Sequence, residues 1–524
     1  MRLNTFKYFQ NLFQYSSFDI TKVVFQKSLA LLYAVAYLIL INQGPGLFGD
    51  KGILPANLFI ERIDFWRSPS LFHLGFNDPL LLIFSSLGFI VSILAVIGIT
   101  EKYGSLLSSF SWFFLWAVYL SFINIGQTFY GYGWETMLTE VGFLAIFLGP
   151  KNVKAPTIII WLIRWVSFRN MLGAGLIKIR GDSCWHDLSC MYVYYETQPV
   201  PNPLSIYFHR LPNFIHQSSV LFTHFVELVV PFGLMAPWRR VAIISGSITI
   251  FFHFIIISSG NLAWLNYLSL IICIPCFDDQ FFNKFCKFKI PKVRPIPMGQ
   301  KIGVFLLTVL VVWRSYYPIM NMISSGQSMN RGYDPFHLVN TYGAFGSITK
   351  IRNELVVLGT MDKNPKTAKW KTYHFRGKPT DPNRMPTIMS PYHWHLDWQM
   401  WFAAFGDYRY SPWMLNFVAK LLQSEPNVLG LIKSDPFNGK RPKWIKVDFY
   451  RYQFQDYGKK GWWKRTYKGQ WLPPLNLENK GFLKILKSKG WYPGPSTKVK
   501  TKVNKGAMIG LAVINGSIVK EMTY

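Results

Sequence analysis

The stretch DPLLLIFSSLGFIVSILAVIGI (78–99) decides the fold class of this chain. After Asp78 it carries no charged side chain, and a helix of about 20 apolar residues spans a hydrocarbon core of about 30 Å. Eight further apolar blocks lie at 23–41, 105–125, 134–149, 157–178, 218–236, 241–259, 262–277 and 302–320. The sequence therefore predicts an all-α membrane bundle of about nine transmembrane helices.

The rest of the chain has a different composition. All of these blocks precede residue 321, and the chain beyond that residue is polar, Lys-rich and interrupted by proline. In this part 352–360, 370–375 and 444–454 have the β-branched and aromatic pattern of strands, whereas 396–405 and 412–423 have helical spacing. We predict a short inside N-terminal segment (1–22), a transmembrane domain (23–320), a soluble α+β domain containing a β-sheet (321–495) and a basic mobile tail (496–524).

The loop charges predict the orientation, because Lys and Arg in short loops resist translocation. Basic residues flank alternate blocks at Arg2, Lys7, Lys22, Lys27, Lys102, Lys151, Lys154, Arg239, Arg240, Lys284, Lys287, Lys289, Lys292 and Arg294. The intervening loops 124–133 and 258–261 carry no charge. This alternation places the N-terminus inside and residues 321–524 outside or in a lumen.

The formal net charge is +30. In a soluble protein such an excess indicates nucleic-acid binding, but membrane proteins carry basic loops for orientation and for contact with anionic headgroups. After Asn321 there are 32 Lys and Arg residues against 12 Asp and Glu. We therefore expect membrane lipids as partners and no nucleic acid, and the basic soluble domain leaves an acidic partner open.

Charged side chains inside spans are costly, so they are candidates for function. Glu135 and Glu140 fall in the fourth block, and Arg164 and Arg169 in the fifth. Because buried charges usually occur in pairs, we favour a structural Glu–Arg network between neighbouring helices over a proton or substrate site.

Three further polar residues lie in later blocks: His224, Glu227 and His253. They could bind a metal or relay a proton, but no HExxH or paired-Cys spacing supports a metal site. We expect a structural polar network, with no metal and no cofactor.

The five cysteines exclude a disulfide scaffold. Cys184 and Cys190 lie in a predicted outside loop, where the environment permits a disulfide. Cys273 and Cys276 have CxxC spacing, but they lie at an inside boundary without a thioredoxin-like context, so we expect two buried thiols.

The densest cluster of chemically versatile side chains lies in the soluble domain. It comprises Tyr392, His393, His395, Asp397, Trp398, Trp401 and Phe402. On a strand, His393, His395 and Asp397 would share one face and could form a metal or acid–base site, whereas on a helix they would spread apart. An aromatic packing junction or an interaction surface is the simpler interpretation.

Four long blocks of the chain are rich in distinctive residues: GYGWETMLTEVGFLAIFLGP (131–150), RNMLGAGLIKIRGDSCWHDLSCMYVYYETQPVPNPLSIYFHRLP (169–212), LVNTYGAFGSITKIRNELVVLGT (338–360) and MSPYHWHLDWQMWFAAFGDYRYSPWMLNFVAKLLQSEPNVLGLI (389–432). These blocks resemble the lipase maturation factor family. The resemblance implies a multi-pass endoplasmic reticulum protein that helps homodimeric lipases fold, assemble and be secreted, or a cytoplasmic-membrane protein if the source is bacterial. It also implies that the protein catalyses no reaction. The lumenal domain would instead bind the lipase clients, with the residues from Tyr392 to Phe402 as a candidate surface.

Two alternatives to a maturation factor remain open. The polar residues of the fourth to seventh blocks would suit a membrane-embedded enzyme of carboxylase-like architecture. Pro231 in the sixth block would allow the broken helix of a transporter, although no inverted repeat is visible. One N-x-S/T sequence, beginning at Asn515, is a candidate glycosylation site.

Overall fold

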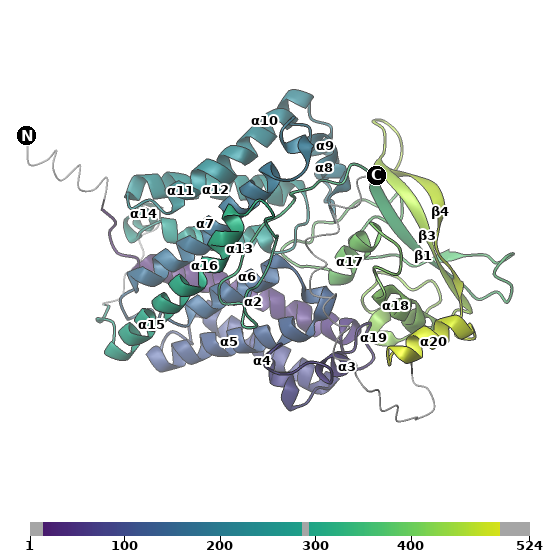
Figure 1. Ribbon diagram of the computed structural model, residues 1–524, viewed down its shortest axis with the longest axis horizontal. Helices are drawn as coiled ribbons and strands as arrows, with labels where there is room; N and C mark the ends of the chain where they lie inside the picture. The colour runs from purple at the N-terminus through teal and green to yellow at the C-terminus, as the bar shows by residue number, and fades with distance from the viewer. Residues whose placement is uncertain (1–13, 286–292, 493–524) are drawn as a thin grey trace, which may run out of the picture.

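The computed structural model describes residues 14–285 and 293–492. The helices of the N-terminal region form a bundle, and a β-sheet lies beyond one end of it, with α17 (His395–Ala403), α18 (Trp413–Leu422) and α19 (Pro426–Leu429) between them (Figure 1). The predicted architecture, a helical membrane region followed by an α+β region, is confirmed. The predicted tail 496–524 and Asn515 lie outside the described residues.

The longer helices of the bundle are α2 (Asp19–Leu47), α4 (Asp78–Ile97), α5 (Ser105–Ile125), α6 (Gly133–Ala145), α7 (Thr157–Ile179), α10 (Asn213–His224), α12 (Arg239–Ser259), α13 (Leu265–Cys273) and α15 (Met298–Arg314). Shorter helical elements connect or extend them: α3 (Ala56–Ile60), η1 (Leu71–Leu74), η2 (Gln127–Tyr130), η3 (Ser183–Trp185), α8 (Met191–Thr197), α9 (Ser205–His209), η4 (Phe225–Val229), α11 (Val230–Leu234), η5 (Ile274–Cys276), α14 (Asp279–Phe285) and α16 (Tyr316–Ile323).

Six helices within the described ranges are long and apolar enough to cross a membrane. They are Asp19–Leu47, Asp78–Ile97, Ser105–Ile125, Asn213–Leu234, Arg239–Ser259 and Met298–Ile323. Helix α4 illustrates how the sequence sets the limits of one span. Asn77 caps its first turn by accepting a hydrogen bond from the Leu80 amide, and Gly98 ends it in the left-handed conformation at φ +83°.

The predicted count of nine spans is not confirmed. Helix α6 has 13 residues and α13 has nine, which gives lengths of roughly 20 Å and 14 Å, short of the hydrocarbon core. Helix α7 has 23 residues, but Arg164, Arg169 and Lys178 lower its hydropathy. These three segments are buried against other helices, which explains why apolar composition alone predicted them as spans.

The C-terminal region contains one antiparallel sheet in the order β2-β1-β3-β4. Its strands are β1 (Arg352–Thr360), β2 (Lys371–Thr372), β3 (Trp444–Phe454) and β4 (Trp463–Leu475), and its helices are α17 (His395–Ala403), α18 (Trp413–Leu422), α19 (Pro426–Leu429) and α20 (Lys480–Ser488). The sequence did not predict β4, because residues 464–468 of this edge strand are all exposed and lack apolar alternation. The strand predicted at 370–375 is only the two-residue β2.

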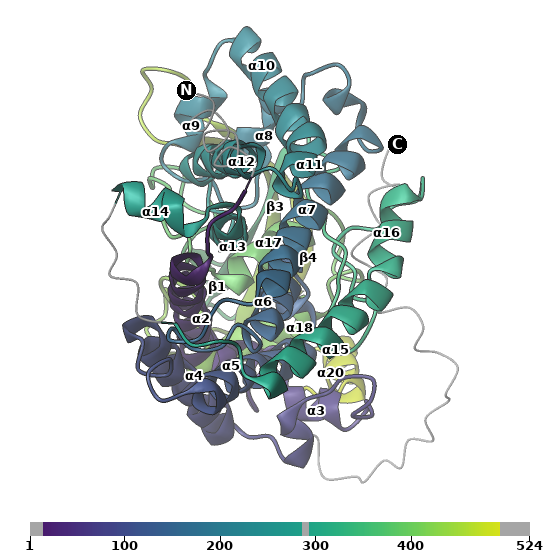
Figure 2. The same cartoon turned by 90° about the vertical axis from the view of Figure 1, so that its left-hand side faces the viewer.

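Within residues 14–285 and 293–492, the segments that were predicted to lie inside come together at one end of the bundle, which faces the viewer in Figure 2. Lys22 Nζ donates to the carbonyl of Pro150 at 2.7 Å, and Arg239 Nε donates to Asp278 Oδ2 at 2.6 Å. The amide of Lys154 donates to the Arg294 carbonyl at 2.9 Å. The sheet lies at the opposite end of the bundle (Figure 1).

The bundle and the C-terminal region share one hydrophobic core. A single cluster of buried residues includes Tyr33 of α2, Trp112 of α5, Leu355 of β1 and Phe417 of α18. The C-terminal region is therefore not a separate domain on a tether, because burying these side chains together requires both parts.

Candidate functional site

The segment that the sequence singled out lies where the C-terminal region meets the bundle. His393, His395 and Asp397 are fully buried, and Trp398 is 4% exposed. Exposure remains at Tyr392 and Trp401, which are half-buried, and at Phe402, which is 41% exposed. Of the two interpretations that the sequence left open, a packing junction or an interaction surface, the burial of these polar and aromatic side chains favours the packing junction. Client binding by this segment stays a prediction.

The two histidines do not form a metal or acid–base site with Asp397. Helix α17 begins at His395, so Asp397 points away and accepts hydrogen bonds from the amides of Gly377 and Lys378 at 2.6 and 2.8 Å. Burial raises the pKa of Asp397. The described residues contain no group of three or more His, Cys, Asp or Glu side chains placed to bind a metal.

His395 instead faces the bundle. Its Nε2 lies 3.3 Å from Glu135 Oε1 of α6, and Tyr119 of α5 donates a hydrogen bond to the other oxygen of that carboxylate. Burial lowers the pKa of His395 to about 3, and burial together with His395 holds the pKa of His393 well below its usual value. Both rings are therefore neutral, and the contact with Glu135 is a hydrogen bond rather than an ion pair.

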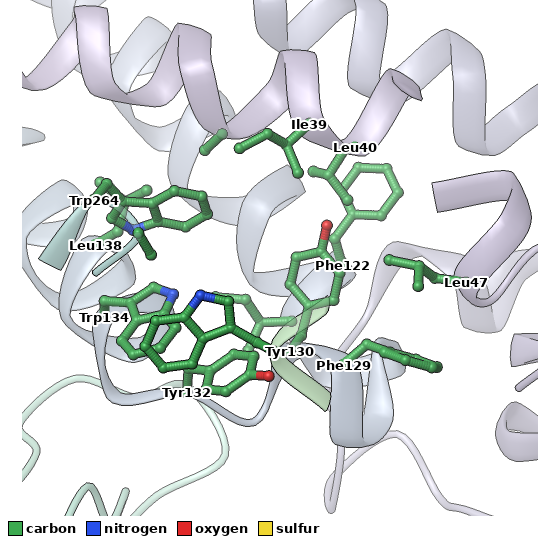
Figure 3. Packing of buried hydrophobic residues seen from close by; sticks show 14 of the residues in the cluster. Ile39, Leu40, Leu47, Phe122, Phe129, Tyr130, Tyr132, Trp134, Leu138 and Trp264 are labelled. Atoms are coloured by element: carbon green, nitrogen blue, oxygen red, sulfur yellow. The ribbon is translucent and has the colours of Figure 1, made fainter. Parts of the chain in front are cut away.

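Aromatic rings surround this pair of histidines. Tyr132 stacks on Trp134 with ring centroids 4.4 Å apart, and Tyr130 stacks on His395 at the same distance. Trp264 of the loop before α13 meets His393 edge-on at 6.0 Å. Figure 3 shows Tyr130, Tyr132, Trp134 and Trp264 on the side of α2 that carries Ile39 and Leu40. Because His395 and His393 contact Tyr130 and Trp264, the C-terminal segment is packed into the bundle's aromatic core.

A second buried cluster joins the parts through Glu140 and Arg169. Arg169 donates to one oxygen of the Glu140 carboxylate, and the other oxygen accepts the Asn340 amide at 3.0 Å and the Tyr342 hydroxyl. Asn340 and Tyr342 come from the segment that leads into the sheet. The pairing places Glu140 beside Arg169, whereas Arg164 donates elsewhere, to the carbonyls of Leu234 and Ala236.

The trio His224, Glu227 and His253 does not converge. Lys178 Nζ donates to both carboxylate oxygens of Glu227 at 2.7 Å. His224 Nε2 lies 3.0 Å from the Trp185 carbonyl, and His253 Nδ1 lies 3.0 Å from Asn266 Oδ1.

Sequence reasoning missed Arg352 at the start of β1. Its guanidinium donates to the carbonyls of Glu196 and Pro199 at 2.9 and 3.0 Å and to Glu354, which Lys378 also pairs at 2.7 Å. This clamp fastens the sheet to the end of α8 and to the loop that follows it. The sequence did contain a sign of this clamp: an Arg lies two residues before a Glu in a strand that is otherwise rich in apolar residues. Charged side chains in such a strand are rarely buried unless they are paired.

The structure also places the four cysteines that lie within its described residues. Cys184 and Cys190 are joined by a disulfide at the end of the bundle that carries the C-terminal region. Cys273 and Cys276 are free and buried.

Comparison with known protein families matches both parts of the chain. Residues 20–284 match the model of the lipase maturation factor transmembrane domain, and residues 338–473 match that of the lipase maturation factor C-terminal domain. No solved structure matches the chain.

Curated relatives cover nearly the whole length. Lipase maturation factor 1 of Mus musculus is 38% identical over 527 residues, which covers 92% of this chain and 91% of that protein. Lipase maturation factor 1 of Homo sapiens is 38% identical over 526 residues, covering 91% and 92%. Lipase maturation factor 2 of Xenopus laevis is 26% identical over 613 residues, covering 91% and 85%. The chain belongs to the lipase maturation factor family.

Proposed function

We propose that this protein is a membrane-bound maturation factor that assists the folding, assembly and secretion of active lipases. Two findings carry this proposal. The chain matches both domains of the family, and relatives named for lipase maturation align with more than nine-tenths of its length. The role is binding rather than turnover. In support, the buried carboxylates of Glu140 and Glu227 form ion pairs with Arg169 and Lys178 and are not available as catalytic groups.

We further propose that the C-terminal region faces the lumen of the endoplasmic reticulum and that the N-terminus faces the cytoplasm. The basic loops gathered at the opposite end of the bundle support this orientation, since such loops stay on the cytoplasmic side. The Cys184–Cys190 disulfide supports it as well, because disulfides persist in oxidising compartments.

New glycosylation acceptors test the orientation. Gly458→Asn with Lys460→Ser creates an acceptor in the exposed turn between β3 and β4, where the left-handed backbone at φ +76° tolerates Asn. Phe285→Thr creates one at exposed Asn283, at the basic end. Because the chain has its own acceptor sequence at Asn515, each variant is compared with the parent chain. We expect one glycan more than the parent carries on the first variant alone, seen as an endoglycosidase-sensitive mass increase. Such an additional glycan on the second variant alone would reverse the proposed orientation.

For client binding we propose the exposed edge of β4. Helix α17 and its neighbours are buried, whereas Lys464, Arg465, Tyr467 and Lys468 are exposed on a strand that ends the sheet. An edge strand offers unpaired backbone groups to an extended chain, which is the form of a partly folded client. The basic side chains favour an acidic client segment.

Complementation of cells that lack their own lipase maturation factor tests both proposals. The full chain should restore the activity of secreted lipase per mass of lipase. Lys464→Glu with Lys468→Glu should lower that restored activity roughly tenfold, because like charges would meet an acidic client.

The matched control reverses two exposed lysines on α20, Lys484→Glu with Lys487→Glu, and should retain full activity. No recovery by a full chain that is expressed and inserted would overturn the lipase role. Equal loss in the two double variants would overturn the β4 surface alone.

A further inference from the structure

A cavity of about 120 Å³ lies inside the bundle between α7, α10, α12 and α13. Its walls are mainly apolar, with rings contributed by Trp185, Tyr194, Phe222, Phe252 and Phe345. Apolar cavities of about 150 Å³ accept benzene, so this one has room for a ring-sized group or for the first carbons of a lipid. Two of the surrounding helices belong to the apolar spans, which places the cavity within reach of the bilayer.

The two charged side chains on the cavity wall pair with each other, and two of its polar side chains are joined by a hydrogen bond. Lys178 Nζ lies 2.7 Å from both oxygens of Glu227, and Asn170 Nδ2 donates to Ser269 Oγ at 3.0 Å. A charged ligand beside a closed ion pair would remain uncompensated in a low-dielectric interior, and that is costly. The cavity therefore selects a neutral ligand.

His253 is one of the residues that line the cavity, and one of its ring nitrogens has no hydrogen-bond partner within the described residues. His253 is 5% exposed, and its Nδ1 faces the amide oxygen of Asn266 at 3.0 Å. Because that oxygen only accepts, Nδ1 carries the hydrogen, and Nε2 of the neutral ring is an acceptor. Within the described part of the chain Nε2 finds no hydrogen-bond donor. A buried acceptor of this kind costs free energy unless a donor reaches it.

The backbone around the cavity is unusual as well. Glu227 lies on η4, a single π-helical turn, and such turns occur frequently at functional sites. Gly175 of α7 permits the close approach of this turn, since a Cβ there would lie 2.9 Å from the Cβ of Glu227. The π turn thus directs the Glu227 carboxylate toward Lys178 at the cavity wall.

We propose that this cavity binds a neutral apolar molecule that carries a hydroxyl group, with the hydroxyl donating a hydrogen bond to Nε2 of His253. The ligand is either the end of a lipid alcohol that enters from the bilayer or a small free alcohol of ring size. This site lies apart from the β4 surface and does not depend on the identity of the client.

Photolabelling of the purified full chain in detergent micelles tests the proposal. The probes are a long-chain alcohol carrying a diazirine near its hydroxyl and the same molecule as its methyl ether, which cannot donate. We expect the alcohol to label peptides containing residues 170–178 or 219–227 roughly tenfold more than the ether, because only the alcohol satisfies His253. Labelling by the alcohol assigns the lipid source. Protection of the same peptides from a water-soluble diazirine by phenol, without such labelling, assigns the small alcohol.

Two variants separate shape from hydrogen bonding. Ala174→Leu fills the cavity and retains His253, so labelling by both probes should disappear. His253→Leu should make the alcohol and the ether label equally. Ala117→Leu, a half-buried position in α5 outside the cavity, is the control and should label as the parent chain does.

Equal labelling of the parent chain by alcohol and ether, together with no protection by phenol, would overturn the proposal. So would labelling that persists in Ala174→Leu. The comparison of the two probes and the phenol protection both use the parent chain, so together they decide the question even where His253→Leu fails to fold.

Discussion

Replacing Arg169 by methionine should lower the free energy of unfolding by about 3–5 kcal/mol. The substitution retains most of the length and apolar volume of the side chain, but it leaves the Glu140 carboxylate buried without its cation. Both side chains are 1% exposed, so water cannot compensate the lost charge. Chemical denaturation of the purified protein in detergent measures the loss.

A double-mutant cycle distinguishes the ion pair from general packing. Glu140→Gln alone should also destabilise the fold, since it leaves Arg169 uncompensated. The combined variant should be clearly more stable than the sum of the two single losses predicts, because neither charge is then left alone.

Arg409→Met provides the matched control. Arg409 pairs with Asp407 on the surface, where its side chain is 77% exposed, and its removal should change the unfolding free energy by no measurable amount. Equal stability losses for Arg169→Met and Arg409→Met would contradict the structural role of the buried pair.

The membrane region was largely predictable from the sequence because its signals are local. The block 78–99 specifies a span by composition alone, and α4 covers Asp78–Ile97. The grouping of the basic loops was also predictable, since charge and sequence position are enough to derive it. The number of spans was not predictable from the sequence, because a buried helix such as α6 can be as apolar as a helix that faces lipid.

The junction was not predictable because its partners are distant in sequence. Glu140 and Arg169 were expected to pair, but nothing local indicates that Asn340 and Tyr342, two hundred residues away, complete the cluster. Likewise, the exposed or buried state of His393 and His395 depends on Tyr130 and Trp264, which the bundle supplies. Aromatic composition suits a client surface and a core equally well.

The same junction predicts that the protein survives a cut between its two parts. Ser325 and Gly326 are exposed after the end of α16, so a protease site inserted there is accessible. Across this cut, Gln43 Nε2 donates to the His393 carbonyl at 2.6 Å, and Asn416 Nδ2 donates to the Ile53 carbonyl at the same distance. These contacts, the Glu140 cluster and the Arg352 clamp all connect one piece to the other.

The central claim is that the bundle and the C-terminal region form one folded unit, and size-exclusion chromatography of the cleaved protein in detergent tests it most directly. We expect the two pieces to elute together at the volume of the intact chain, because the shared core and the buried polar contacts hold them after the covalent link is lost. Elution of the C-terminal piece alone, as a soluble domain, would contradict the claim.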